Sequence, residues 1–128
     1  MAMKRFVLSA AFFAIALILN AQTAAAAEWR VPLTPASRYA FAKAKAKYKD
    51  IGGEREFQVE AENLRTLRGT ALSVQVNGVI IGRMRINVFG NGRFSRNTDL
   101  GQSVPVISRG SRVVLRRLDG GKVFSGTF

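Results

Sequence analysis

The sequence predicts a small all-β domain, an antiparallel sandwich or barrel of about eight short strands, preceded by a cleavable signal peptide. Three observations predict this fold class. From residue 41 onward, apolar and polar residues alternate with the two-residue period of a half-buried strand. Turn residues interrupt the alternation about every 8 to 12 residues. No segment after residue 28 shows the spacing of an amphipathic helix.

The first 27 residues have the layout of a secretory signal peptide. Lys4 and Arg5 give a positive start, and residues 6–19 are almost entirely apolar. Small side chains, Ala25 and Ala27, then stand three positions and one position before the expected cleavage point. The apolar run is shorter than the ~20 residues that a membrane-spanning helix needs. We therefore expect cleavage near Ala27, export to the periplasm or the extracellular space, and no transmembrane helix in the processed chain.

The processed chain is predicted to form one domain without disulfides. Residues 28–38 contain two prolines and no periodic pattern, so we expect an extended lead-in, followed by a single all-β domain over residues 39–128. The sequence has no cysteine, which excludes both a lipid-anchored cysteine and stabilising disulfides. A domain of about 100 residues buries roughly 65% of the surface of its unfolded chain, which is enough for one core.

The stretch AFAKAKAKYK, residues 40–49, places a lysine at every second position from Lys43 to Lys49. On a helix, with ~100° between successive residues, these lysines would lie on both sides and leave no apolar stripe. On a strand the lysines share one face, while Ala44 and Ala46 share the other. The pattern therefore predicts a strand.

A second alternating segment, EREFQVEAE at residues 54–62, carries glutamates where the first carries lysines. We expect a turn through residues 50–53 to pair the two segments as follows: Lys49 with Glu54, Lys47 with Glu56, Lys43 with Glu60, Ala46 with Phe57, and Ala44 with Val59. Each opposed pair of this kind contributes ~0.2–1 kcal/mol. The lysine row is thus matched mainly within its own sheet face and is weak evidence for a partner.

Six further strands are predicted along the rest of the chain, at residues 70–76, 79–88, 93–97, 104–107, 112–118 and 122–128. Asn77-Gly78 predicts a tight hairpin, because both central residues of a type I′ turn need positive φ. The strand after this turn is expected to present two faces: Met84, Ile86 and Val88 to the core, and Arg83 and Arg85 to solvent.

Four short motifs follow one another in the second half of the chain: VNGVIIG, GNGRF, DLGQSVPVISRGSRVVL and GGKVFSGTF. This order resembles small exported bacterial all-β domains of uncharacterised function, which carry a VNG…VG hairpin, a glycine-rich turn, a VP…G segment and a closing GTF-like strand. The resemblance implies the fold and export, and it implies no activity and no functional residue. Arg93 and Arg96 stand here where acidic and aliphatic residues are more usual in that family.

The residue types that carry most enzyme chemistry are missing. The sequence has no histidine and no cysteine, hence neither the commonest general base nor a thiol nucleophile nor the main transition-metal ligands. The seven serines after residue 27 lack an activating motif, and the acids lie in the paired hairpin or at turns such as Asp50, Asp99 and Asp119. The GNG turn at residues 90–92 lacks the third glycine and the following helix of a phosphate loop. We predict a non-enzymatic protein without catalytic residues, metal site or cofactor, and infer no small-molecule substrate.

Nearly all of the excess positive charge of the processed chain lies in its second half. The 20 basic residues less Lys4 and Arg5, against 8 acidic ones, give the processed chain a net charge of +10. Residues 28–63 hold 7 basic and 6 acidic residues, whereas residues 64–128 hold 11 and 2. Arginine is well suited to binding phosphate, sulfate or carboxylate through two parallel hydrogen bonds. The candidate anion-binding residues are Arg83, Arg85, Arg93, Arg96, Arg112 and Arg116.

Two classes of function fit these features. The first is an exported structural or interaction domain that docks on an envelope protein and whose arginines serve solubility. The alternative is a binding module for an anionic polymer or headgroup, either a phosphate-bearing lipid, an acidic polysaccharide or, less readily, nucleic acid. Nucleic acid fits less well because, among the arginines, only Phe94 offers a stacking surface. The sequence does not distinguish a sandwich from a barrel, or a monomer from an oligomer.

Overall fold

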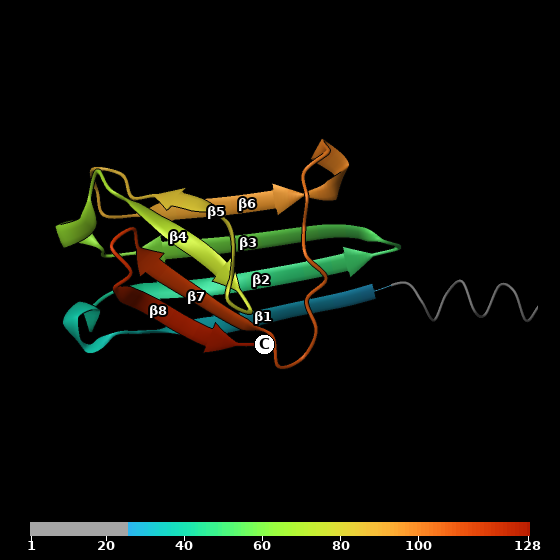
Figure 1. The fold of residues 1–128 in the computed structure, drawn as a ribbon, viewed down its shortest axis with the longest axis horizontal. Coiled ribbons are helices and arrows are strands. Elements are labelled where there is room, and N and C mark those ends of the chain that lie inside the picture. Colours follow the sequence, from blue (N-terminus) through green and yellow to red (C-terminus); the bar gives the residue numbers. More distant parts are fainter. Residues whose placement is uncertain (1–25) are drawn as a thin grey trace, which may run out of the picture.

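The computed structural model describes residues 26–128, which form eight antiparallel strands arranged as a nearly closed barrel (Figure 1). The predicted all-β class is confirmed, and the architecture is the barrel rather than the sandwich. The predicted signal peptide lies outside the described residues except for Ala26 and Ala27, and among residues 26–128 there is no helix of the length and apolarity needed to cross a membrane.

The strands are β1 (Ala26–Pro35), β2 (Lys43–Ile51), β3 (Glu54–Glu62), β4 (Ala71–Val76), β5 (Val79–Arg85), β6 (Gly92–Asn97), β7 (Arg112–Arg117) and β8 (Lys122–Thr127). Short 3-10 helices connect some of them: η1 (Ser37–Tyr39), η2 (Arg65–Leu67) and η3 (Thr98–Leu100).

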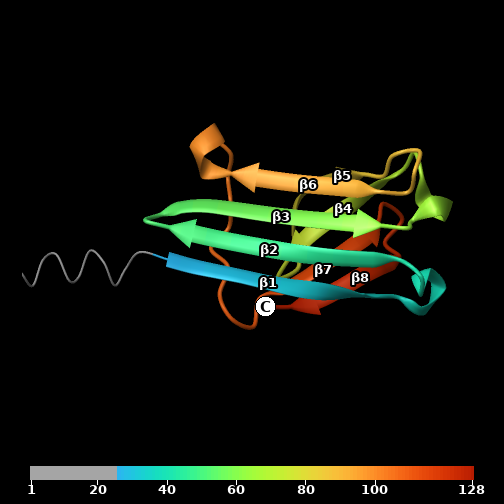
Figure 2. The same ribbon diagram turned by 180° about the vertical axis from the view of Figure 1, so that it is seen from behind.

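The barrel consists of two four-stranded halves. The strand order is β5-β4-β7-β8-β1-β2-β3-β6, so β1, β2, β3 and β6 form one half and β5, β4, β7 and β8 form the other. Figure 2 shows the first half in front, with its long strands nearly parallel to one another, and the shorter strands of the second half crossing behind it. The halves join along β1 and β8, where Thr34 pairs with Ser125 and Pro35 with Phe124.

The second join, between β5 and β6, is a seam with little backbone pairing. Ile86 and Gly92 form an isolated bridge at one end of it. Further along, Nη2 of Arg96 donates a hydrogen bond to the carbonyl oxygen of Ile81 at 2.8 Å. The ring of Phe94 lies so close to Gly82 that a Cβ at that position would have no room. Side chains of β6 therefore replace the ladder hydrogen bonds that would close the barrel fully.

Residues 28–35 of the predicted extended lead-in belong to strand β1, and the 3-10 helix η1 begins at Ser37. The segment is extended, but it is an integral strand that pairs with β2 from Ala26 to Leu33. Its alternation is real: Val31 packs against the core, and Leu33 is buried. The prolines are compatible with a strand here because each is paired on one edge only, Pro32 with Lys45 of β2 and Pro35 with Phe124 of β8, and proline is tolerated where a strand edge lacks a partner.

The β2–β3 hairpin keeps the predicted faces but not the predicted register. Lys49 pairs with Glu56, Lys45 with Glu60, and Tyr48 rather than Ala46 faces Phe57. The turn is shorter than expected, because Gly52 and Gly53 alone close it, with φ of 59° and 88°. The predicted pairs were therefore wrong by two residues. A shift of two leaves every side chain on its predicted face, since the period of a strand is two.

Aromatic residues from both halves meet in the interior. The ring centroid of Trp29 lies 5.8 Å from that of Tyr48 and 6.4 Å from that of Phe128. The ring of Phe57 lies 6.3 Å from Phe94 and 6.5 Å from Phe128, both in edge-to-face arrangements. Such pairs add to the large apolar area that each ring removes from water. The C-terminal residue thus links β1 and β3 through the core.

Two predicted strand segments have a different structure. β5 ends at Arg85, so Val88 lies in the following turn, exposed rather than in the core. Residues 104–107 pair with no strand in the described chain; they belong to the long β6–β7 connection, which crosses one end of the barrel (Figure 1). Val104 and Ile107 are buried there. The short apolar run therefore covers the barrel end instead of joining the sheet.

Candidate anion-binding site

Basic side chains form a row across the outer face of the second half of the barrel. Arg83 of β5 pairs with Ser73 of β4, Ser73 pairs with Arg116 of β7, and Arg116 pairs with Lys122 of β8. Directly paired residues on neighbouring strands point to the same face. Adjacent strands lie about 4.8 Å apart, so the backbones of Arg83 and Arg116 are separated by roughly 10 Å.

The strands of this half carry no acid. β4, β5, β7 and β8 together hold six basic residues and no acidic one, whereas β1, β2, β3 and β6 hold eight basic and six acidic residues. We call the first set of four strands the arginine half and the second the acid-matched half. The positive excess that the sequence places after residue 63 is therefore gathered mainly on one side of the barrel.

A groove of about 560 Å³ lies at one end of the arginine half. Arg83 and Arg85, both exposed on β5, line one side, and Arg117 of β7 lines the other. Thr70 and Ala71, at the start of β4, also line it. We call this hollow the arginine groove. It brings three guanidinium groups to one concave surface.

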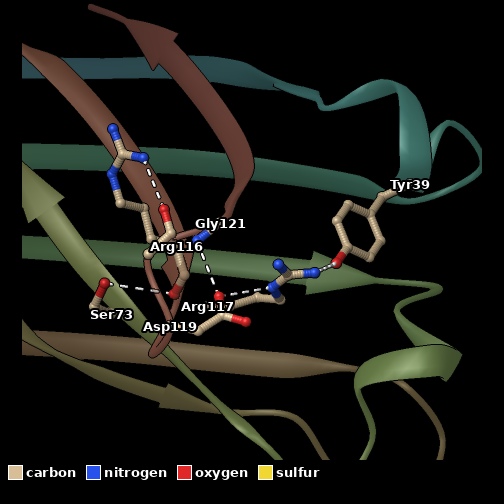
Figure 3. A network of polar contacts seen from close by, with 7 residues as sticks. Tyr39, Ser73, Arg116, Arg117, Asp119 and Gly121 are labelled. Carbon is tan, nitrogen blue, oxygen red and sulfur yellow. Dashed lines mark hydrogen bonds and ion pairs between the residues drawn. The ribbon is translucent and has the colours of Figure 1, made fainter.

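Arg117 is the groove residue that sequence reasoning missed. It pairs with the buried Leu72 and therefore lies on the inward face of the barrel, at the last residue of β7. Its Nη1 donates to the hydroxyl of Tyr39 at 3.2 Å, and its Nε donates to Oδ1 of Asp119 at 3.0 Å (Figure 3). The signal in the sequence is the turn Asp-Gly-Gly two residues downstream, which places a carboxylate within reach of this arginine.

Asp119 is the one acid at the groove among the lining residues, and it is held by two donors. Its Oδ1 accepts a hydrogen bond from the Gly121 N–H at 3.0 Å and from Nε of Arg117 (Figure 3). The Gly121 N–H and, next, the Arg117 guanidinium lower the pKa of Asp119 below its ordinary value. The same contact raises the pKa of Arg117. Asp119 is therefore a carboxylate whose ion pair is with Arg117, and among the described residues Arg83 and Arg85 form no ion pair.

Arg116 lies next to the groove and is partly committed to the fold. Its Nη1 donates to the carbonyl oxygen of Gly120 at 3.1 Å, and its own carbonyl oxygen accepts from the hydroxyl of Ser73 at 3.4 Å (Figure 3). A guanidinium has five donors. Arg116 therefore keeps further donors, and its cross-strand partner is Lys122.

The other three candidate arginines lie elsewhere. Arg93 faces the acid-matched half, and its Nε is 3.8 Å from Oε1 of Glu60. Arg96 points inward at the β5–β6 seam, where its Nε is buried without a hydrogen-bond partner among the described residues. Arg112 lies on the outer face of the arginine half, at the end remote from the groove, opposite Thr127. Only Arg83 and Arg85 of the six candidates thus line the groove, with Arg116 adjacent.

Within residues 26–128 no three acidic residues come close enough together to hold a metal ion. No known family model matches the chain, and no curated protein matches it significantly. The resemblance to exported bacterial domains therefore stays a prediction, and the function rests on the chemistry of the surface itself.

Proposed function

We propose that this chain is a non-catalytic binding domain that holds phosphate- or sulfate-bearing ligands on the arginine groove and the adjoining row of basic side chains. One observation carries the proposal: six basic residues and no acid on the four strands of the arginine half. A guanidinium donates two parallel hydrogen bonds to such an anion, and these charge-assisted bonds are about twice as strong as neutral ones.

The arrangement suits an extended or repeated anion better than a single small one. The groove is open, and the row from Arg83 to Lys122 continues it across four strands. A ligand with several negative groups can therefore contact several cations at once, and each contact adds to the affinity and to its dependence on salt. Acidic envelope polysaccharides and the headgroups of phospholipids both have this chemistry.

Export and the lack of catalysis complete the proposal. The layout of residues 1–27 supports secretion to the periplasm or beyond, where such anions are abundant. The absence of histidine and cysteine from the whole sequence supports a binding role over an enzymatic one. The groove itself offers guanidinium groups and one carboxylate, which bind and orient anions.

Retention on a phosphate-bearing resin over a salt series tests the proposal. The variant Arg83→Gln/Arg85→Gln removes two exposed charges from the groove, so we expect earlier elution and a salt slope that falls by about one unit for each arginine replaced. Lys45→Gln/Lys47→Gln removes two charges from the acid-matched half and is the matched control, expected to elute close to the unchanged protein. Equally early elution of both variants would show that net charge alone causes retention, which contradicts a specific site.

A second candidate, docking on another envelope protein, is favoured by the edge of β5. The contacts of β5 with β6 begin at Ile81, so the first two residues of β5, Val79 and Ile80, lie beyond the seam and are 64% and 61% exposed. An exposed strand edge with apolar side chains can pair with a strand of another protein. A complex captured from envelope extract that survives high salt, and that Val79→Lys abolishes, would support this function over anion binding.

A further inference from the structure

Four connections lie together at one end of the barrel. Successive strands run in opposite directions, so the connections β1–β2, β3–β4, β5–β6 and β7–β8 share an end, on the left in Figure 1. We call this the connection end; its connections are residues 36–42, 63–70, 86–91 and 118–121. The arginine groove opens at this end, because Leu67 and Leu118 of two of these connections form part of its lining.

Large apolar side chains are exposed at the connection end. Phe41 is 91% exposed and Phe89 is 75% exposed. Val88, next to Phe89, and Leu118, at the rim of the groove, are also exposed. Two phenylalanines and two aliphatic residues on three separate connections therefore stand in water, although each would gain free energy by leaving it.

Hydrogen bonds hold these connections in place. The N–H of Leu64 donates to the carbonyl oxygen of Gly90 at 2.8 Å, which ties the β3–β4 connection to the β5–β6 connection. The side-chain oxygen of Asn87 accepts from the N–H groups of Phe89 and Asn91, both at 3.0 Å, and so fixes the turn that carries Phe89. A surface that is already ordered loses little conformational entropy when it binds.

Charge distinguishes the connection end from the opposite end. With the flanking strand ends included, it holds eight basic and two acidic residues, over residues 36–43, 62–71, 85–92 and 116–122. The opposite end holds three basic and three acidic residues, over residues 50–55, 76–79 and 97–112. Apolar residues such as Leu100 and Val106 are exposed there too. Exposed apolar side chains coincide with an excess of positive charge only at the connection end of the described chain.

A soluble polyanion would satisfy the arginines and leave Phe41 and Phe89 in water. The surface of an anionic bilayer can bind the arginines and also remove the two phenylalanines from water, because phosphates lie at the level of the headgroups and the acyl chains begin just below them. Basic residues near such a surface gain free energy from its negative potential, and apolar side chains gain more by entering the acyl boundary.

We propose that the connection end docks on the surface of an anionic phospholipid bilayer, with Phe41 and Phe89 inserted below the headgroups and the arginine groove on the lipid phosphates. This inference rests on the proposed function and names its ligand: the anions in the groove are those of phospholipids. The chain lies on the bilayer and reaches into one leaflet through two connections.

Co-sedimentation with phosphatidylcholine vesicles, with and without phosphatidylglycerol, tests this inference. We expect binding to the phosphatidylglycerol vesicles only. The variant Phe41→Ser/Phe89→Ser should bind them about tenfold more weakly or worse, while its retention on the phosphate resin stays unchanged because the groove arginines remain. Val79→Ser/Ile80→Ser, which changes two exposed apolar residues away from the connection end, is the control and should bind the vesicles normally.

The outcomes separate the two proposals. Unchanged vesicle binding by Phe41→Ser/Phe89→Ser, or retention on the resin without any vesicle binding, overturns the bilayer inference and leaves anion binding in place. Failure to bind both resin and vesicles overturns the proposed function as well. The variant Trp29→Phe/Phe89→Trp gives an independent readout, because its single tryptophan then lies at the connection end. We expect the fluorescence of this tryptophan to shift to shorter wavelength on vesicles that contain phosphatidylglycerol. An unchanged emission wavelength would overturn insertion.

Discussion

The two halves of the barrel carry similar numbers of cations but differ in what surrounds them. In the acid-matched half, Glu60 lies 3.4 Å from Nζ of Lys45 and 3.8 Å from Nε of Arg93, so that one glutamate serves two strands. Glu28 does the same for Arg30 and Lys47, at 3.2 and 3.8 Å. In the arginine half, Asp119 in the β7–β8 turn pairs with one arginine, and the strands themselves supply no acid.

This difference shows that a run of lysines in a sequence does not by itself indicate an anion-binding surface in the structure. An anion that approached the acid-matched half would meet glutamates already placed among the cations and would be repelled by them. An anion that approached the arginine half meets cations whose neighbours are small or neutral, such as Ser73 and Thr70. Binding therefore depends on the absence of internal partners more than on the number of cations.

The largest expected effect comes from the residue that holds the halves together at the seam. Phe94 packs on Phe57 in the acid-matched half and covers Gly82 of β5 in the arginine half. Phe94→Ala should lower the free energy of unfolding by about 3–5 kcal/mol, because it leaves a cavity at this junction. Phe89→Ala removes the same ring from an exposed site and should change it by less than about 0.5 kcal/mol.

Urea denaturation of both variants measures this contrast. A single transition with an unchanged slope is expected, since the halves share one core. A decrease below about 1 kcal/mol for Phe94→Ala, or two separate transitions in the unchanged protein, would show that the halves are not joined through this ring.

A smaller effect is expected at Asp119. Because the folded chain lowers the pKa of this carboxyl below its ordinary value near 3.8, the charged form stabilises the fold above that pH, and the contribution disappears as the pH falls through the folded value. Asp119→Asn should therefore flatten the loss of thermal stability between about pH 5 and 2. It also frees Arg117, so retention on the phosphate resin at neutral pH should increase.

Asp99→Asn is the matched control for the resin, because Asp99 is an exposed acid at the opposite end of the barrel. The same increase in both variants would mean that net charge governs retention. If Asp119→Asn loses thermal stability at acidic pH as steeply as the unchanged protein, the hydrogen bonds of Asp119 with Gly121 and Arg117 do not stabilise the fold.

Local periodicity predicted the faces of the strands but not their partners. The alternation placed Arg83 and Arg85 outward correctly, because it needs no knowledge of other strands. The convergence of Arg83 with Arg116 depends on β7 lying beside β4, a contact between segments about 40 residues apart that no local pattern encodes. The same alternation could have placed Arg96 correctly: two residues after the buried Phe94, it shares the inward face.

The errors have specific physical causes. Two glycines with positive φ closed the β2–β3 turn with two residues rather than four, which shifted the register without changing the faces. Strand β1 was not predicted because it contains two prolines, although each proline lies where one edge of the strand has no partner. The apolar run at residues 104–107 was wrongly predicted as a strand, because its buried residues, Val104 and Ile107, belong to a loop that packs on the core.

The smallest expected effect tests whether the glutamates of the acid-matched half stabilise the fold or only neutralise its surface. The ion pair between Lys45 and Glu60 is largely exposed, and such pairs contribute ~0.2–1 kcal/mol. Lys45→Gln should thus change the free energy of unfolding by about 0.5 kcal/mol or less, and Glu60→Gln by somewhat more, because Glu60 also lies beside Arg93. Both changes should vanish in high salt.

Glu60→Gln should also increase retention on the phosphate resin, because it removes the acid that lies beside both Lys45 and Arg93. If retention does not change, the difference between the two halves in anion binding does not arise from ion pairs within the acid-matched half.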